Sequence, residues 1–169
     1  MVGTATVLPL QSVTLPGGAE VDLAFGLGGT AAGAFVSTLL VGAILVALAP
    51  EYTRRMMRAV REDIVGSFVY GLVALVVLVV LTVFLVISLV GILIAFPLVL
   101  LTSVVWAGGA AIGYLAIAER LVGVDDGWLK PLLVAAAING GLTLTAVGGL
   151  ISFCVGATGF GAVLRDWLG

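Results

Sequence analysis

Three long stretches of the sequence carry no charged side chain, and this feature limits the possible folds more than any other. They cover residues 23–50, 64–118 and 131–164. At 1.5 Å per residue, about 20 helical residues cross a hydrocarbon core of about 30 Å. Charged residues make up only 9% of the chain, whereas a water-soluble surface needs roughly 25–35%. The sequence therefore predicts an all-α membrane protein that crosses the bilayer several times.

The first uncharged stretch predicts one spanning helix over residues 30–49, which ends beside Pro50 because proline stops helices. Residues 1–29 contain proline, glycine and an alternation of Val21, Leu23 and Phe25, which is typical of short extended segments and loops. They lack the basic residues and continuous apolar run of a signal peptide. We therefore expect an extracellular segment over 1–29 and a membrane domain over 30–169.

The second stretch, 64–118, would extend about 80 Å as a single helix and must therefore turn back on itself. Gly91 and Pro97 are the residues most able to interrupt it. We expect a kinked helical hairpin of two helices of about 25 residues each, with its turn near residues 88–91. A turn at Pro97 is the alternative.

The third stretch has Gly148 and Gly149 near its middle. We interpret it as a short glycine-rich hairpin over 131–166, made of helices over 131–147 and 150–166 that span or re-enter the membrane. One long kinked helix is the alternative. The fold class is thus a polytopic helical protein with about five helical segments, besides the link over 51–63.

Four arginines lie in this link, and they indicate its side of the membrane. The loop over 51–63 is short and lies between spans, where the positive-inside rule is most reliable, so we place it in the cytoplasm. The N-terminus is then outside, and the segment 119–130 and the C-terminus are inside. Trp128 and Trp167 flank charged residues and are expected at the same interface.

Helical spacing within the link predicts an amphipathic helix. Arginines form one stripe, and apolar residues such as Met56 and Val60 lie near the opposite one. Such a helix can rest its apolar side in the acyl boundary while the arginines contact lipid phosphates, or it can dock a partner protein. The lipid-facing or partner-facing residues are Arg54, Arg55, Arg58 and Arg61.

Small and polar residues inside the apolar stretches predict contacts between helices, either within the chain or between copies in a homo-oligomer. Asn139 needs a partner in lipid, so we expect it to join two helices, with a substrate or ion role as the alternative. The predicted packing residues are Gly109, Gly113, Asn139, Gly141, Thr145, Gly149, Ser152 and Gly156.

Several classes of function lack the residues they require. The chain has no histidine and one cysteine, Cys154, so neither a disulfide nor a cysteine-histidine metal cluster is expected. The net charge of −2 argues against nucleic-acid binding. No ionisable side chain lies centrally in a span, so we expect no enzyme, no metal and no cofactor. Six arginines, one lysine and an acidic excess are typical of a GC-rich or halophilic source, such as an archaeon.

The order of segments resembles the integral membrane domain associated with bactofilin-type polymer-forming proteins of bacteria and archaea. The resemblance covers about residues 30–167 and rests on APEYTRR, RRMMRAVRED, LVGILIAFP, AIGYLAIAERL and GGLISFCVGATGFGAVL. In that family a β-rich repeat domain precedes the first span, and residues 1–29 are too short to form one. The resemblance therefore implies a membrane module that works beside a separately encoded polymer-forming or envelope protein, and it implies no catalytic residues.

We therefore expect a non-catalytic membrane anchor or scaffold for an envelope or cytoskeletal assembly, with membrane lipids as its surroundings. A small oligomeric channel is the alternative. A pore lining would need hydroxyl groups along one helix face, and the candidates are Ser88, Thr102, Ser103, Thr143 and Thr145. Their scattered positions favour the scaffold.

Overall fold

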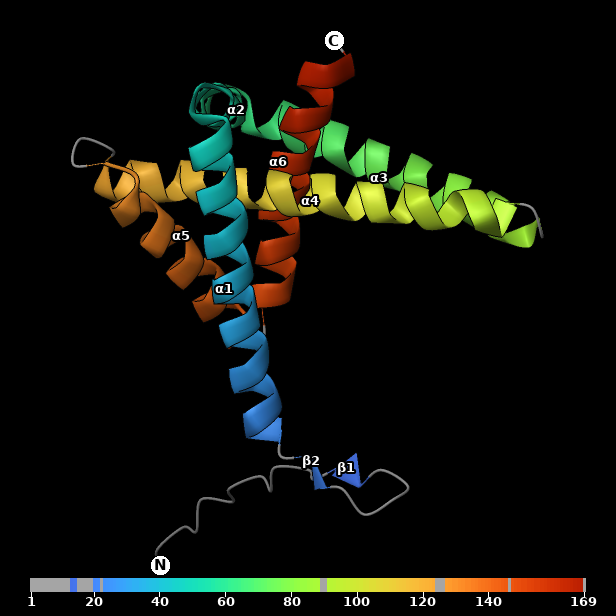
Figure 1. Ribbon diagram of the computed structural model, residues 1–169, viewed down its shortest axis with the longest axis horizontal. Coiled ribbons are helices and arrows are strands. Elements are labelled where there is room, and N and C mark those ends of the chain that lie inside the picture. Colours follow the sequence, from blue (N-terminus) through green and yellow to red (C-terminus); the bar gives the residue numbers. More distant parts are fainter. Residues whose placement is uncertain are drawn as a thin grey trace, which may run out of the picture.

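The computed structural model describes residues 13–14, 20–21, 23–88, 91–123, 127–145 and 147–168. In these residues six helices follow a two-stranded antiparallel pair (Figure 1). The elements are β1 (Val13–Thr14), β2 (Glu20–Val21), α1 (Leu23–Leu48), α2 (Pro50–Glu62), α3 (Ile64–Ile87), α4 (Gly91–Val122), α5 (Leu129–Leu142) and α6 (Gly148–Leu168). The all-helical fold class predicted from the sequence is confirmed.

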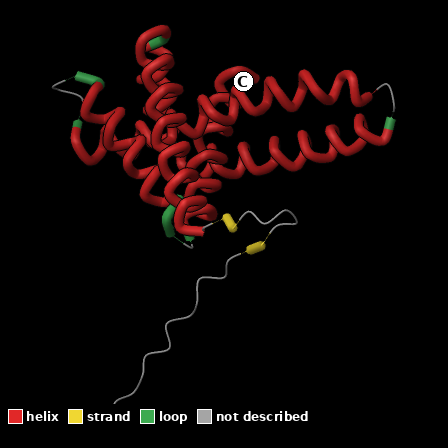
Figure 2. The backbone as a smooth tube through the Cα atoms, turned by 60° about the horizontal axis from the view of Figure 1, so that its bottom comes forward, coloured by secondary structure: helices red, strands yellow, loops and turns green. Residues whose placement is uncertain are grey.

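Helices α3 and α4 form a long hairpin that runs across the direction of α1 and α6 (Figure 1). A second view shows the hairpin leaving the other helices and projecting to one side (Figure 2). Helix α6 packs against both α3 and α4, while α5 packs against α1. The remaining helix, α2, lies across the end of this bundle from which the C-terminus emerges. The first residues of α3 and the C-terminal part of α4 therefore both lie near α2.

The helix boundaries agree with the expected turns. Helix α1 ends one residue before Ala49, and Pro50 begins α2, because a first-turn proline lacks only a backbone donor that would be unsatisfied there anyway. Helix α3 ends at Ile87 and α4 begins at Gly91, as expected for a turn near residues 88–91; residues 89 and 90 lie outside the described residues. Pro97 lies inside α4 and does not end it.

The predicted start of the first helix was wrong. Residues 23–29 were expected to be extended, but helix α1 already begins at Leu23. From Leu23 to Leu48 the chain has no proline, and glycines are tolerated in membrane helices. The predicted extended segments are found only at β1 and β2, and residues 1–12, 15–19 and 22 lie outside the described residues.

The C-terminal hairpin exists, but its turn comes earlier than expected. Helix α5 ends at Leu142, and Gly148 already begins α6. The hydroxyl groups of Thr143 and Thr145 donate to the carbonyl oxygens of Gly140 and Leu142, at 2.6 and 2.9 Å. These hydrogen bonds satisfy carbonyl groups that the helix end leaves without partners.

Helix α6 passes between α3 and α4 at direct backbone contact. A Cβ atom at Gly159 would overlap the carbonyl group of Gly109 on α4, and one at Gly161 would overlap the carbonyl oxygen of Ser67 on α3. Glycine is the only residue that permits such an approach. We call this contact the glycine crossing; it consists of Gly71, Gly109, Gly113, Gly159 and Gly161.

The buried core lies where α2 meets the other helices. Met56 and Met57 of α2 are each 1% exposed, and Tyr114 and Leu115 of α4 are equally inaccessible. Ala135 of α5 and Ala162 of α6 complete this cluster. Most side chains of α3, by contrast, stay exposed, because the distal part of the hairpin has no other helix beside it.

Candidate functional site

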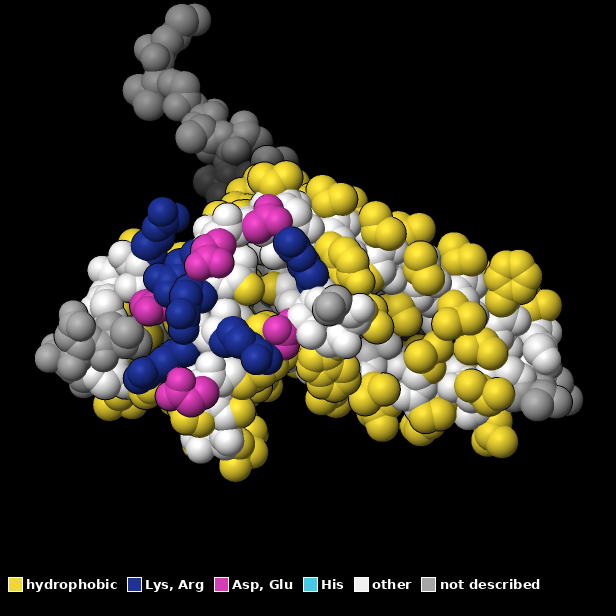
Figure 3. Space-filling model, turned by 90° about the horizontal axis from the view of Figure 1, so that it is seen from above, with side chains coloured by type: hydrophobic (Ala, Val, Ile, Leu, Met, Phe, Trp, Pro, Cys, Tyr) yellow, Lys and Arg dark blue, Asp and Glu magenta, His cyan; other side chains and the backbone are white. Residues whose placement is uncertain are grey.

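Charged side chains gather on one face of the molecule, over α2 and the neighbouring helix ends (Figure 3). The visible part of the hairpin carries apolar side chains instead. We call this surface the charged face. Its described residues are Glu51, Arg54, Arg55, Arg58, Arg61, Glu62, Asp63, Glu119, Arg120, Lys130, Arg165 and Asp166.

Among the residues that the structure describes, three ion pairs join segments that are distant in the sequence. Arg61 Nη2 lies 2.7 Å from Glu119 Oε2 on α4, and this pair is the least exposed of the three. Arg55 Nη2 lies 2.7 Å from Asp166 Oδ2 on α6. Arg165 Nη1 donates to Asp63 Oδ2, also at 2.7 Å. The link 51–63, the end of α4 and the C-terminal end of α6 therefore share one face.

The arginines of α2 mostly bind other parts of the protein. Besides the two ion pairs, the guanidinium carbon of Arg54 lies 5.2 Å from the centre of the Trp128 ring, within range of a cation–π interaction. Among the described residues, Arg58 is the arginine of α2 for which no ion pair or ring contact is found. Three of the four candidate arginines thus stabilise the position of α2, and the Arg58 side chain is exposed.

The apolar side of α2 does not rest in the acyl boundary, as one of the sequence hypotheses held. Met56, Met57 and Val60 are buried among α4, α5 and α6, so protein covers this side of the helix. An amphipathic pattern shows that one side of a helix is buried, and it is the same whether lipid or protein covers that side. Because protein covers it here, the opposite, arginine-bearing side faces away from the bundle.

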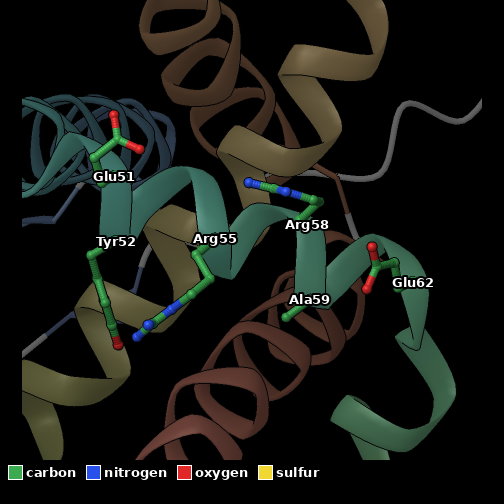
Figure 4. Close-up of a pocket in the computed structure, with 6 residues that line it drawn as sticks. All are labelled: Glu51, Tyr52, Arg55, Arg58, Ala59 and Glu62. Atoms are coloured by element: carbon green, nitrogen blue, oxygen red, sulfur yellow. The ribbon is translucent and has the colours of Figure 1, made fainter.

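The charged side of α2 lines a shallow cleft of about 550 Å³. In Figure 4, Arg55 points toward Tyr52, while Glu51 and Glu62 lie near opposite ends of the helix with Arg58 between them. Burial, and then the nearby Asp166 carboxylate, raise the pKa of the Tyr52 phenol above its ordinary value. Positive charges lie in the middle of this cleft, and negative charges lie toward its ends.

A second cleft of about 330 Å³ adjoins the first, because Ala59 and Glu62 line both. It continues past Asp63 to Arg165 and Asp166 at the end of α6. Together the two clefts form a mixed-charge groove along α2, from Glu51 to the end of α6. Such a groove can bind a charged protein segment by complementary pairs.

Asp63 fixes the junction between α2 and α3. Its Oδ1 accepts a hydrogen bond of 2.8 Å from the backbone N–H of Gly66, which caps α3, while Oδ2 binds Arg165. The hydrogen bond with Arg165, followed by the one with Gly66, holds the pKa of the Asp63 carboxyl below its ordinary value near 3.8. The carboxylate therefore stabilises the fold fully above that value, and this contribution is lost as the pH falls through the lowered pKa.

We expect Asp63→Ala to lower the melting temperature in detergent at pH 7 more than Asp63→Asn does. Asparagine keeps a capping oxygen and loses only the charge, whereas alanine loses both. The difference between wild type and Asp63→Asn should stay constant from pH 7 to pH 5 and shrink on further acidification. Equal melting temperatures for the two variants at pH 7 would contradict the capping role.

The glycines at 109 and 113 contact α6 within the same chain. Gly109 faces the backbone of Gly159 and Phe160, and Gly113 faces Val155. Gly156 lies under the ring of Trp106. Gly141 and Gly149 have no heavy atom within 4 Å of where a Cβ would lie. These two glycines contribute no close packing among the described residues.

Asn139 joins α5 to α1, as its position in an apolar stretch led us to expect. Its Nδ2 donates to the Thr38 hydroxyl at 2.6 Å and to the Ala34 carbonyl at 3.3 Å. Thr145 belongs to the turn before α6, and the Ser152 hydroxyl is buried. The Asn139 amide thus binds the protein itself, which is what a structural contact requires.

Three of the five hydroxyl groups suggested as a pore lining donate to backbone carbonyl groups of their own segment. Ser103 donates to the Val99 carbonyl at 2.8 Å, and Thr143 and Thr145 donate within the turn after α5. Thr102 and Ser103 line the groove between α3 and α4, whereas Thr143 and Thr145 lie at the turn after α5, so the five do not form one row. Within the described residues, no three His, Cys, Asp or Glu side chains come together as a metal site.

Sequence reasoning missed several residues that hold this site. Gly71 and Gly161 were not among the predicted packing residues, yet both take part in the glycine crossing. Glu119 and Asp166 hold α2 in place, but they lie far from it in the sequence. The available signal was the grouping of charged residues at 51–63, 119–130 and 165–166, because opposite charges predicted on one side of a membrane can pair.

The fold and the charged face define an α-helical membrane protein. Four of its described helices, α1, α3, α4 and α6, are long and apolar enough to cross a membrane. The chain belongs to a family described as a domain of unknown function, DUF8173, whose model matches residues 1–168. No curated protein and no solved structure matches the chain.

Proposed function

We propose that this protein is a non-catalytic membrane anchor whose charged face docks a protein of an envelope or cytoskeletal assembly. The observation that carries this proposal is the mixed-charge groove along α2. Ion pairs to α4 and α6 hold α2 in position, and the buried side chains of Met56 and Met57 keep it packed against the bundle. A rigid binding surface loses little entropy when a partner binds.

The arginines favour a cytoplasmic position for this surface, because basic residues next to short spans stay inside. The N-terminus then lies outside. A water-soluble partner fits better than lipid, since the charged side of α2 points away from the helices that enter the bilayer. The resemblance to bactofilin-associated domains suggests a separately encoded polymer-forming protein as the class of partner.

A pull-down after cross-linking tests this proposal. The tagged wild-type chain, Arg58→Ala and Arg120→Ala are purified in mild detergent from the native host, and the co-purifying proteins are quantified. Arg58 lines the groove, whereas Arg120 is an exposed arginine outside it. We expect an envelope or filament protein whose recovery falls by about fivefold or more in Arg58→Ala and stays unchanged in Arg120→Ala. Recovery that is equal in all three, or no such partner with wild type, would refute docking at this groove.

A further inference from the structure

The distal part of the α3–α4 hairpin, described over residues 75–88 and 91–104, leaves the bundle and exposes apolar side chains wherever its two helices do not face each other. We call it the distal hairpin. The most exposed large side chains flank its turn: Phe84 at 72%, Ile87 at 79%, Leu93 at 80% and Phe96 at 74%. Figures 1 and 2 show no other helix beside this region. Hydrocarbon is the surrounding in which such a surface is stable.

The glycine crossing fixes the direction in which the hairpin projects. Backbone atoms of Gly71 and Gly161, and of Gly109 and Gly159, are in direct contact, so α3 and α4 cannot swing about α6 without opening these contacts. The hairpin therefore runs across α1 and α6 (Figure 1). When α1 and α6 cross the bilayer, the hairpin runs at an angle to the membrane normal. Its tip then reaches a smaller depth in the bilayer than the length of α3 or α4 would allow.

The sequence around the turn gives independent evidence of its depth. Residues 78–101 contain no charged residue, no tryptophan, no tyrosine and no side-chain amide. A turn that reaches the opposite headgroup region usually carries such anchoring residues. Both ends of the hairpin do carry them, with Asp63 before α3 and Glu119 near the end of α4, and both bind partners on the charged face.

Backbone polarity does not prevent the turn from lying in hydrocarbon. The N–H of Ser88 donates to the Leu85 carbonyl at 3.1 Å, and the N–H of Ile92 donates to the Ser88 carbonyl at 3.2 Å. These bonds reduce the cost of placing a turn away from water. The groove between the two helices, about 400 Å³, is lined mainly by apolar side chains. In it, Thr82 and Ser103 donate to their own helices, which leaves a surface suited to an acyl chain.

We infer that the α3–α4 hairpin enters the bilayer from the charged face and ends among the lipid acyl chains without crossing to the other side. Its partner is the lipid hydrocarbon. The protein then spans the membrane through α1 and its C-terminal helices, while the hairpin acts as a wedge that anchors the charged face to the membrane. This inference does not depend on a docked protein.

Single cysteines in a Cys154→Ala background test this inference. Ser88→Cys and Phe84→Cys report on the tip, Arg58→Cys on the charged face and Glu20→Cys on the segment before α1. Each variant is reconstituted in sealed vesicles of phosphatidylcholine and phosphatidylglycerol and exposed to a membrane-impermeant maleimide from either side. Labelling after solubilisation in dodecyl sulfate gives the full reaction.

We expect position 58 and position 20 to react from opposite sides, and the two tip cysteines to react at least about tenfold more slowly from both sides. Reaction of the tip from the side that labels position 20 would show that the hairpin crosses, and reaction from the side that labels position 58 would show that it lies outside the bilayer. A fluorophore attached at Ser88→Cys gives a second measurement. We expect stronger quenching by lipids brominated on the acyl chain than by headgroup-labelled lipids, and the reverse order would overturn the inference.

Discussion

Gly159→Ala is expected to destabilise the folded protein by about 3 kcal/mol, because a new Cβ would overlap the Gly109 carbonyl. Neither backbone can move aside easily, since α6 is held on its other side by the contact of Gly161 with α3. The clash is therefore with backbone on both sides of one helix. Thermal unfolding in dodecyl maltoside, followed by circular dichroism and size-exclusion chromatography, measures the loss.

Gly33→Ala is the matched control for this variant. Gly33 lies inside α1, is exposed, and has no heavy atom of the described residues within 4 Å of a Cβ position. Since alanine favours a helix more than glycine does, we expect this variant to be unchanged or more stable by about 0.5–1 kcal/mol. A similar melting temperature for Gly159→Ala and Gly33→Ala would mean that α6 does not pass between α3 and α4 at backbone contact.

The sequence predicted the features of this fold that depend on length and local pattern. An uncharged stretch as long as 64–118 must turn, and Gly91 marked the place. The arginine spacing in 51–63 predicted the amphipathic helix α2, and Asn139 predicted a contact between helices. Each of these follows from one segment and its solvent, so no knowledge of other segments was needed.

Features that depend on which segments meet could not be predicted in this way. The spacing of Gly109 and Gly113 indicates a close contact but not that Gly159 is opposite. The apolar side of α2 could equally have met lipid or protein, and only the positions of α4 and α5 decide. The same limit applies to the candidate site: Arg58 became distinct from its neighbours once Asp166, Glu119 and Trp128 were seen to bind the other three arginines.

Met57→Ala is expected to reduce stability by about 2–5 kcal/mol, as the truncation of a buried core side chain usually does. Met57 is 1% exposed and belongs to the cluster formed by α2 with α4, α5 and α6. The variant should lower the melting temperature in detergent and should also loosen the charged face, because α2 would lose part of the packing that holds it under the groove.

Leu93→Ala is the matched control for the loss of stability expected in Met57→Ala. Leu93 is 80% exposed on the distal hairpin, so its truncation removes contacts with detergent or lipid only and should change stability by no more than about 0.5 kcal/mol. If α2 instead rested in the acyl boundary, Met57 would be as exposed to lipid as Leu93, and the two variants would melt together. A lower melting temperature for Met57→Ala than for Leu93→Ala would show that α2 is part of the protein core. Its arginines then form a surface that the buried side of the same helix holds in place.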